Sequence, residues 1–380
     1  MNKLDLLAEW STKWVERNGL RFYWEVEGHP YKFCNKHLAN WYERERNCWA
    51  AFVDQQFSSI KDILADQTLD VDHNYNADYL HKLREEHDYI QFFFSGGSDS
   101  ITVLEEAVEQ DIFLDEIISL YIENIDYDCN KEIVVNAMPY IAKHSKSYGK
   151  FTLLNTSFDL LADHFKDPYG FFTLSTAMAA PLNIGRPFMG VLQRHEIANS
   201  CYIKCSDKPT VVHHRGEWYA TFLDGSYGGE NAIRGLKYFW LEADNIKSFV
   251  KDARVYRDYV KDNHVLDKTT QFFKANPKDT ANALLRTNPG NMQFQMEKNY
   301  GDERMDEKYA LRFMDAIKKP HYDLLIGYFK CLDKFFEIFP ETRTDGFTKY
   351  NACDRFAWFI NIDTLEVFSQ QELIPNGFTE

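Results

Sequence analysis

The clearest pattern in the chain is an alternation of buried strands with amphipathic helices in its middle part. Four short apolar runs have the length and composition of strands that are buried on both faces: 88–94, 116–122, 151–155 and 200–206. Between them, apolar residues recur three and four positions apart, which predicts helices over 98–110, over 130–147 and near 189–198. Strands that alternate with helices in this way predict crossover connections and a parallel sheet with helices on both faces.

Residues 209–225 have a different pattern, in which two β-rich halves flank Arg215 and Gly216. A short glycine-containing turn between two such halves is typical of a β-hairpin. We therefore expect a hairpin here, appended to the parallel sheet.

Helical spacing returns on either side of this middle part. In residues 1–85, aromatic residues are mixed with many charged ones, and Trp41 and Phe52 can share one helical face. Toward the C-terminus, apolar residues again recur three and four positions apart, before an aromatic and irregular tail. The sequence thus predicts an α/β chain, with a doubly wound parallel sheet and its hairpin in 86–235, between mainly helical regions in 1–85 and 236–380.

Composition narrows the class of protein. Hydrophobic residues make up 44% of the 380 residues and charged residues 27%, as in soluble globular proteins, and no apolar run is long enough to span a bilayer. The chain starts without a secretion-signal pattern, and its 7 scattered cysteines are typical of reduced thiols, so we expect a cytoplasmic protein. The net charge of -15 disfavours bare nucleic acid as a partner. The 16% aromatic content leaves room for a protein partner on the flanking regions or for a homo-oligomer.

One segment carries candidate chemistry: Ser-Gly-Gly-Ser-Asp-Ser at 95–100, directly after a predicted strand and at the start of a predicted helix. Two glycines permit a tight turn, and the backbone N–H groups at a helix N-terminus bind anions. The serine hydroxyls add donors, and the Asp99 carboxylate can bind a magnesium ion that is shared with phosphate. A plain glycine turn with a serine N-cap would not explain the whole string. No lysine follows the glycines, so the segment differs from GxxxxGK[ST] phosphate loops.

The segment resembles the SGGxDS loop of the PP-loop ATP pyrophosphatase superfamily, whose members have the adenine nucleotide α-hydrolase-like fold. The resemblance implies that ATP is cleaved to AMP and pyrophosphate and that Asp99 binds Mg²⁺. The other residues of the loop would bind the leaving pyrophosphate together with Asp99: Ser95, Gly96, Gly97, Ser98 and Ser100. In such folds the end of the second strand contacts adenine, which implicates Tyr121 and Glu123. Residues 238–261 and the SDKP element are also similar to phage-encoded, asparagine-synthase-like PP-loop proteins.

A second group of polar residues follows the fourth predicted strand and includes Cys205, Asp207 and Lys208. Because the carboxyl ends of parallel strands meet at one edge of a sheet, we expect these side chains to face the same crevice as the loop. Lys208 can neutralise charge that develops on the α-phosphate, and Asp207 can bind a second metal or orient an amine. A solvated turn before Pro209 explains the same residues equally well.

The function predicted from these residues is an ATP-dependent, AMP- and pyrophosphate-forming ligase or amidotransferase-like enzyme. It would adenylate a carboxylate or carbonyl group of an acceptor, in nucleotide or nucleic-acid modification among other settings, and then transfer an amine. Asn2 stands where glutamine-using relatives have a cysteine, so an attached glutaminase is not expected. Two alternatives stay open: a non-catalytic nucleotide-binding or scaffold protein, and a sulfurtransferase or reductase of the same fold that uses Cys205.

Overall fold

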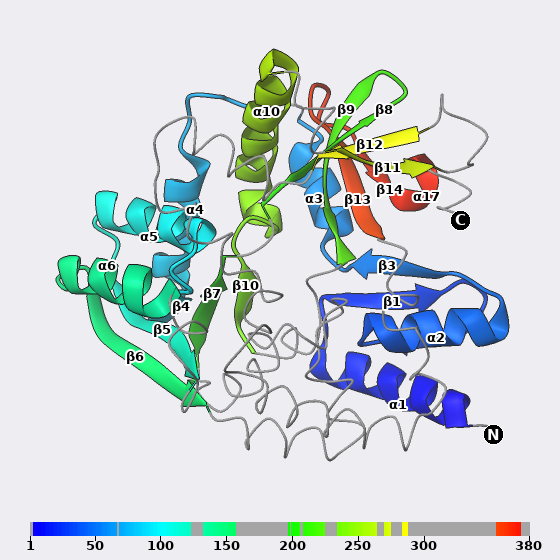
Figure 1. Ribbon diagram of the computed structural model, residues 1–380, viewed down its shortest axis with the longest axis horizontal. Helices are drawn as coiled ribbons and strands as arrows, with labels where there is room; N and C mark the ends of the chain where they lie inside the picture. The colour runs from blue at the N-terminus through cyan, green and yellow to red at the C-terminus, as the bar shows by residue number, and fades with distance from the viewer. Residues whose placement is uncertain are drawn as a thin grey trace, which may run out of the picture.

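The computed structural model contains three β-sheets with helices packed between and against them (Figure 1). It describes residues 3–66, 68–122, 132–156, 197, 199–205, 208–224, 234–263, 270–274, 283–287 and 355–373. One sheet is parallel and two are antiparallel, so the chain is of the α/β class with added antiparallel sheets. Within the described ranges, none of the helices has the length and apolar character needed to cross a membrane.

Five parallel strands form the central sheet, in the order β10-β7-β4-β5-β6. The four strands predicted from apolar runs are confirmed: β4 (Tyr89–Phe93), β5 (Leu114–Ile122), β6 (Tyr148–Thr156) and β7 (Ser200–Lys204). The fifth strand, β10 (Leu236–Tyr238), does not follow from the apolar pattern and extends the sheet past residue 235.

Helices α4 (Tyr75–Glu86), α5 (Ser98–Glu109) and α6 (Met138–Lys143) lie together beside this sheet (Figure 1). Ile90 and Phe92 of β4 are fully buried in the same core cluster as residues of α4 and α5. Burial of such apolar side chains is the main force that holds helix and strand together.

The helix predicted over 98–110 is confirmed by α5. The helix predicted over 130–147 is confirmed in part, because a π-helical segment, Glu132–Ala137, leads into α6 and the chain enters β6 at Tyr148. Most of the helix predicted near 189–198 lies outside the described residues.

The hairpin predicted over 209–225 is present as β8 (Thr210–His214) and β9 (Glu217–Leu223). Arg215 and Gly216 have φ angles of 51° and 85°. Positive φ at both central residues is what a type I′ turn requires, and this turn matches the twist of the two strands.

The hairpin does not extend the parallel sheet, contrary to the prediction. It forms the middle of a six-stranded antiparallel sheet with the order β11-β12-β8-β9-β13-β14. The other strands come from the C-terminal part: β11 (Thr270–Lys274), β12 (Ala283–Thr287), β13 (Phe356–Asn361) and β14 (Val367–Ser369). Strands β12 and β13 pair with both edges of the hairpin, whose backbone N–H and C=O groups would otherwise lack partners.

The prediction of a mainly helical region over 236–380 is therefore wrong for its described part, which mixes helices with strands. The tail, predicted to be irregular, contains β14 and helix α17 (Gln370–Leu373). Helix α10 (Ile246–Asn263) confirms the helical spacing predicted earlier in the region. The remaining helical spacing, over 311–339, lies outside the described residues.

The N-terminal region contains a sheet that its helical texture does not predict. Helices α1 (Lys3–Asn18), α2 (Lys36–Arg46), α3 (Phe57–Leu64) and α4 hold most of its residues, as expected. Three short strands pair in the order β2-β1-β3: β1 (Phe22–Val26), β2 (Lys32–Phe33) and β3 (Ala50–Asp54). Trp41 and Phe52 do not share a helical face, because α2 ends at Arg46 and Asn47 turns the chain with a φ of 48°. Buried residues then alternate along β3 with the period of a strand.

Helix α10 lies between the six-stranded sheet and helix α4. It contacts β8 and β9 of the six-stranded sheet and also α4 beside the parallel sheet. Its fully buried Phe249 and Val250 belong to one core cluster that also contains residues of the N-terminal and parallel sheets. The core therefore runs continuously past residues 85 and 235, where the sequence places region boundaries.

Candidate functional site

The loop of residues 95–97 connects the carboxyl end of β4, the middle strand of the parallel sheet, with the start of α5. Gly96 has a φ of 77°, a conformation that residues with a side chain rarely adopt. The N–H of Gly97 donates to Ser95 Oγ at 3.2 Å, and Ser100 Oγ donates to the Gly97 carbonyl at 2.9 Å. Because Ser100 is only 2% exposed, its hydroxyl holds the loop together from inside.

The start of α5 is suited to binding an anion. Gly97 is the N-cap residue and provides no side-chain cap for the first turn. The N–H groups of a first helical turn lack intrahelical partners and carry the positive end of the helix dipole. Asp99 lies in this turn with a side chain that is 32% exposed. A magnesium ion held mainly by phosphate oxygens and water needs few protein ligands, and this carboxylate fits that need.

The loop lies where the strand order of the parallel sheet reverses. From β4 the chain continues through α5 to β5 on one side, whereas β7 lies on the other side of β4. Ligands of open parallel sheets bind at such points, outside the carboxyl ends of the strands. Residues that follow β7 reach the loop here, and Lys208 Nζ is 3.5 Å from Asp99 Oδ1. The two groups of polar residues noted in the sequence therefore meet.

Lys208 is largely enclosed, with a side chain that is 9% exposed. Its Nζ lies 5.3 Å from the ring centroid of Trp240, which follows β10 and is fully buried. A cation over an indole ring is attracted by the negative face of the ring, most strongly where solvent is excluded. Lys208 thus contacts both a carboxylate and an aromatic ring.

Asp252 of α10 adds a second carboxyl group to this cluster. The pKa of Asp252 is raised from the ordinary 3.8 to about 6, mainly by burial and to a smaller extent by the charge of Asp99. The positive charges of Lys208 and Lys251 lower this pKa in part. The Trp240 indole N–H lies close enough to lower this pKa but makes no hydrogen bond of normal geometry. The carboxyl groups of Asp99 and Asp252 therefore both lie near the ammonium group of Lys208.

Cys205 also belongs to the cluster, between the end of β7 and Lys208. Burial, followed by the charge of Asp99, raises the pKa of its thiol well above the ordinary value, while Lys208 lowers it. The group is therefore a thiol and not a thiolate at neutral pH. Across the described part of the chain, no three His, Cys, Asp or Glu side chains gather closely enough to hold a metal ion.

The remaining predicted residues are placed as follows. Tyr121 is near the carboxyl end of β5, partly buried, on the same edge of the sheet as the loop. Ser98 begins α5. Asp207 and Glu123 lie outside the described residues. The roles predicted for these four residues stay predictions.

Trp240 and Asp252 were not predicted as site residues, although the sequence contains a feature that points to each of them. Trp240 is the second residue after β10, so recognition of that strand would have placed it at the ligand edge of the sheet. Asp252 is one position before the fully buried Ala253 and three after the fully buried Phe249, so a carboxylate interrupts an otherwise apolar helical stripe.

No family model, curated protein or solved structure matches this chain.

Proposed function

We propose that the protein is an ATP-dependent enzyme that releases AMP and pyrophosphate, as the PP-loop resemblance implies, on a doubly wound adenine nucleotide α-hydrolase-like fold. One observation carries the proposal. Lys208 and Asp99 lie in the segments that follow two neighbouring parallel strands, and they meet at 3.5 Å beside a helix N-terminus without a side-chain cap. A cation, a metal-binding carboxylate and the amides of a helix N-terminus are groups that suit a nucleoside triphosphate with Mg²⁺.

Each group has a separate part in the proposed reaction. The loop and the first turn of α5 would hold the pyrophosphate portion, and Asp99 would hold the magnesium ion that neutralises phosphate charge. An acceptor carboxylate or carbonyl oxygen attacks the α-phosphorus, and the bond to the pyrophosphate oxygen breaks. Lys208 stabilises the charge that develops on the α-phosphate. An amine then attacks the activated carbon, loses a proton, and AMP leaves.

The thiol-based alternative has less support in this site. A sulfurtransferase needs a reactive thiolate, whereas burial and Asp99 hold the pKa of Cys205 well above its ordinary value. The scaffold alternative needs only nucleotide binding. A measurement of ATP turnover therefore distinguishes it from the proposed enzyme.

Calorimetry with magnesium pyrophosphate and magnesium ATP tests the binding half of the proposal. Loss of a charge-assisted contact in Lys208→Ala should weaken both ligands by roughly ten- to a hundredfold. The matched control is Lys82→Ala, a lysine of α4 with a 42% exposed side chain that pairs with Asp244 at 2.8 Å. This control should bind as the wild type does. Absence of binding of both ligands to the wild type would overturn the proposal.

ATP labelled on its α-phosphate tests the reaction itself. With Mg²⁺, ammonium and a mixture of amino acids as candidate acceptors, the label should appear in AMP. Label in ADP would contradict the proposed chemistry. Tight binding of ATP without AMP formation under any acceptor mixture would favour the scaffold alternative.

A further inference from the structure

Lys208 reaches the candidate site on a flexible side chain, and a lysine ammonium is not held in one place by its own stem. Two contacts hold the ammonium here, one with the Asp99 carboxylate at 3.5 Å and one with the Trp240 ring at 5.3 Å. An incoming phosphate and its magnesium ion compete for both members of the ion pair. The neutral indole does not compete with phosphate, so its contact with the ammonium can persist when the ligand binds.

Trp240 itself is rigidly held. It is fully buried, and its ring meets that of Phe239 edge to face, with centroids 5.4 Å apart and an interplanar angle of 86°. The N–H of Phe239 donates to the carbonyl of Lys204, the last residue of β7, at 3.0 Å. The backbone before the indole is therefore anchored to the strand that leads to Lys208.

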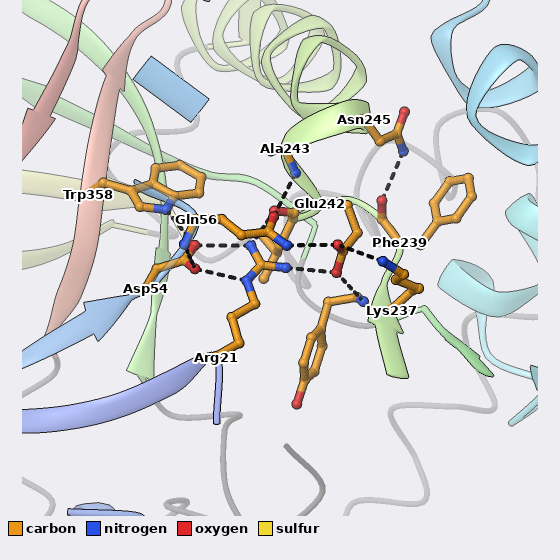
Figure 2. Close-up of polar contacts among 11 residues, drawn as sticks. Arg21, Asp54, Gln56, Lys237, Phe239, Glu242, Ala243, Asn245 and Trp358 are labelled. Carbon is orange, nitrogen blue, oxygen red and sulfur yellow. Dashed lines mark hydrogen bonds and ion pairs between the residues drawn. The ribbon is translucent and has the colours of Figure 1, made fainter. Parts of the chain in front are cut away.

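Arg21 and Gln56 of the N-terminal region hold the backbone that follows Trp240, and we call this pair of residues the Arg21 clamp (Figure 2). Arg21 donates to the carbonyl of Leu241 and, at 2.7 Å, to Glu242 Oε1. Gln56 donates to Glu242 Oε2 at 3.0 Å and accepts from the N–H of Ala243 at 2.8 Å. Charge-assisted hydrogen bonds of this kind are among the strongest that proteins make.

The Asp54 carboxylate holds the Arg21 side chain in place. Asp54 at the end of β3 accepts from Arg21 Nε at 2.8 Å and from Nη2 at 3.0 Å, as Figure 2 shows. The parallel geometry of these two bonds orients the guanidinium plane. The indole of Trp358 donates to the same carboxylate at 3.0 Å.

We propose that Trp240 is a positioning residue that holds the Lys208 ammonium where a ligand phosphate arrives, and that the Arg21 clamp keeps the indole in place. The identity of the ligand in this proposal rests on the proposed function, whereas the position of Lys208 can be measured without a ligand. Through the Arg21 clamp, the N-terminal region contributes to the geometry of the site.

A double-mutant cycle with magnesium pyrophosphate as the probe tests the proposal. Trp240→Leu removes the aromatic face and should weaken binding on the order of tenfold, whereas Trp240→Phe keeps a ring and should lose about threefold or less. In the Lys208→Ala background, Trp240→Leu should cause no further loss, because the indole acts through Lys208. Equal losses in both backgrounds, or none in a folded Trp240→Leu protein, would overturn the proposal.

The chain offers a matched control for the loss of a buried tryptophan. Trp218 of β9 is 8% exposed and has Lys261 Nζ at 5.6 Å from its ring centroid, so it makes the same type of contact away from the loop. Trp218→Leu should leave the affinity for magnesium pyrophosphate unchanged. A loss equal to that of Trp240→Leu would mean that general destabilisation explains both, and would overturn the positioning role.

Nuclear magnetic resonance of protein with ¹³C-labelled lysine gives a readout that needs no ligand. The ring current of Trp240 should shift the ε-protons of Lys208 upfield in the wild type, with Lys208→Ala for assignment. Trp240→Phe should retain part of this shift. This variant replaces Trp240→Leu in the test if Trp240→Leu does not fold. If the wild type binds no pyrophosphate, the proposed function fails, and an upfield shift still supports the positioning role. Absence of that shift in the wild type overturns it.

Discussion

Asp224 and Asp99 are the same residue type in opposite settings. Asp224, which follows β9, is 0% exposed, and both its oxygens are saturated. Its donors are Lys36 Nζ at 2.6 Å, the Trp24 indole at 2.9 Å, and the backbone N–H and Nη1 of Arg355 at 3.1 and 3.5 Å. The Asp99 side chain is 32% exposed, and its cation, at 3.5 Å, lies beyond good hydrogen-bond distance.

The difference separates a structural carboxylate from one that can receive a ligand. The donors of Asp224 come from β1, from the start of α2 and from the residue before β13, so this carboxylate joins the N-terminal sheet to the six-stranded sheet. A buried carboxylate with all its acceptor sites filled has nothing left for a ligand. A looser, partly exposed ion pair can exchange its partners for magnesium and phosphate. Solvent exposure and a loose ion pair, and not charge itself, therefore distinguish the site.

The largest effect is expected from Asp224→Ala. The change removes the 2.6 Å ion pair of Lys36, whose side chain is 2% exposed. It also removes the longer, 3.5 Å contact of the buried Arg355, which keeps its ion pair with Glu43. Breaking one side of a buried ion pair costs about 3–5 kcal/mol. Urea denaturation should show this loss in the free energy of unfolding, with the milder Asp224→Asn as a substitute if the variant does not fold.

The control for this prediction is Asp363→Ala. Asp363 is 63% exposed and pairs with Arg257, so its loss should change stability by less than about 1 kcal/mol. If Asp224→Ala were as mild as this control, the buried cluster would not be structural and the comparison with Asp99 would fail.

A smaller effect of the opposite sign is expected from Asp252→Asn. Burial raises the pKa of Asp252 in the folded state to about 6. Above that pH the carboxyl group is ionised in the folded protein, and its ionisation opposes folding. Removing the charge should stabilise the protein at pH 8 by about 1–2 kcal/mol, with allowance for the partial exposure of the side chain. The advantage should shrink below about pH 6 and nearly vanish at about pH 4, where the unfolded chain also becomes protonated.

Urea denaturation of both proteins across this pH range provides the measurement. Asp258→Asn, on the same helix with a 56% exposed side chain, is the control and should change the free energy of unfolding by less than about 1 kcal/mol. A destabilised Asp252→Asn protein at pH 8 would mean that Asp252 resembles Asp224, and would remove it from the site.

The sequence predicts much of the parallel sheet because local pattern decides it. Strands buried on both faces appear as continuous apolar runs, as in β4 and β7, and the glycine-rich loop between β4 and α5 has a composition that few other structures require. The hairpin follows from its turn residues, but its sheet does not, because its partner strands β12 and β13 are distant in sequence. The end of α2 at Arg46 is likewise set by tertiary pairing of β3 with β1, which overrides helical spacing.

The site follows from the sequence only where the chain supplies it locally. The loop and the segment with Lys208 come from ends of predicted strands, so the edge rule for parallel sheets places them together. Trp240 and Asp252 join them through packing of β10 and α10, and no local pattern specifies that packing. The Arg21 clamp depends on contacts across 221 residues, between Arg21 and Glu242.

The smallest effect on stability is expected from Asp99→Asn. The change removes a partly exposed ion pair at 3.5 Å and a favourable charge in the first turn of α5, which together contribute less than about 1 kcal/mol. Asp78→Asn is a close match, because Asp78 lies in the first turn of α4, is 65% exposed and pairs with His73 at 2.6 Å. Both variants should unfold in urea within about 1 kcal/mol of the wild type, and only Asp99→Asn should weaken magnesium-dependent pyrophosphate binding. A loss near 3 kcal/mol would place Asp99 with Asp224 among the structural carboxylates, and the contrast between the two settings would no longer mark a site.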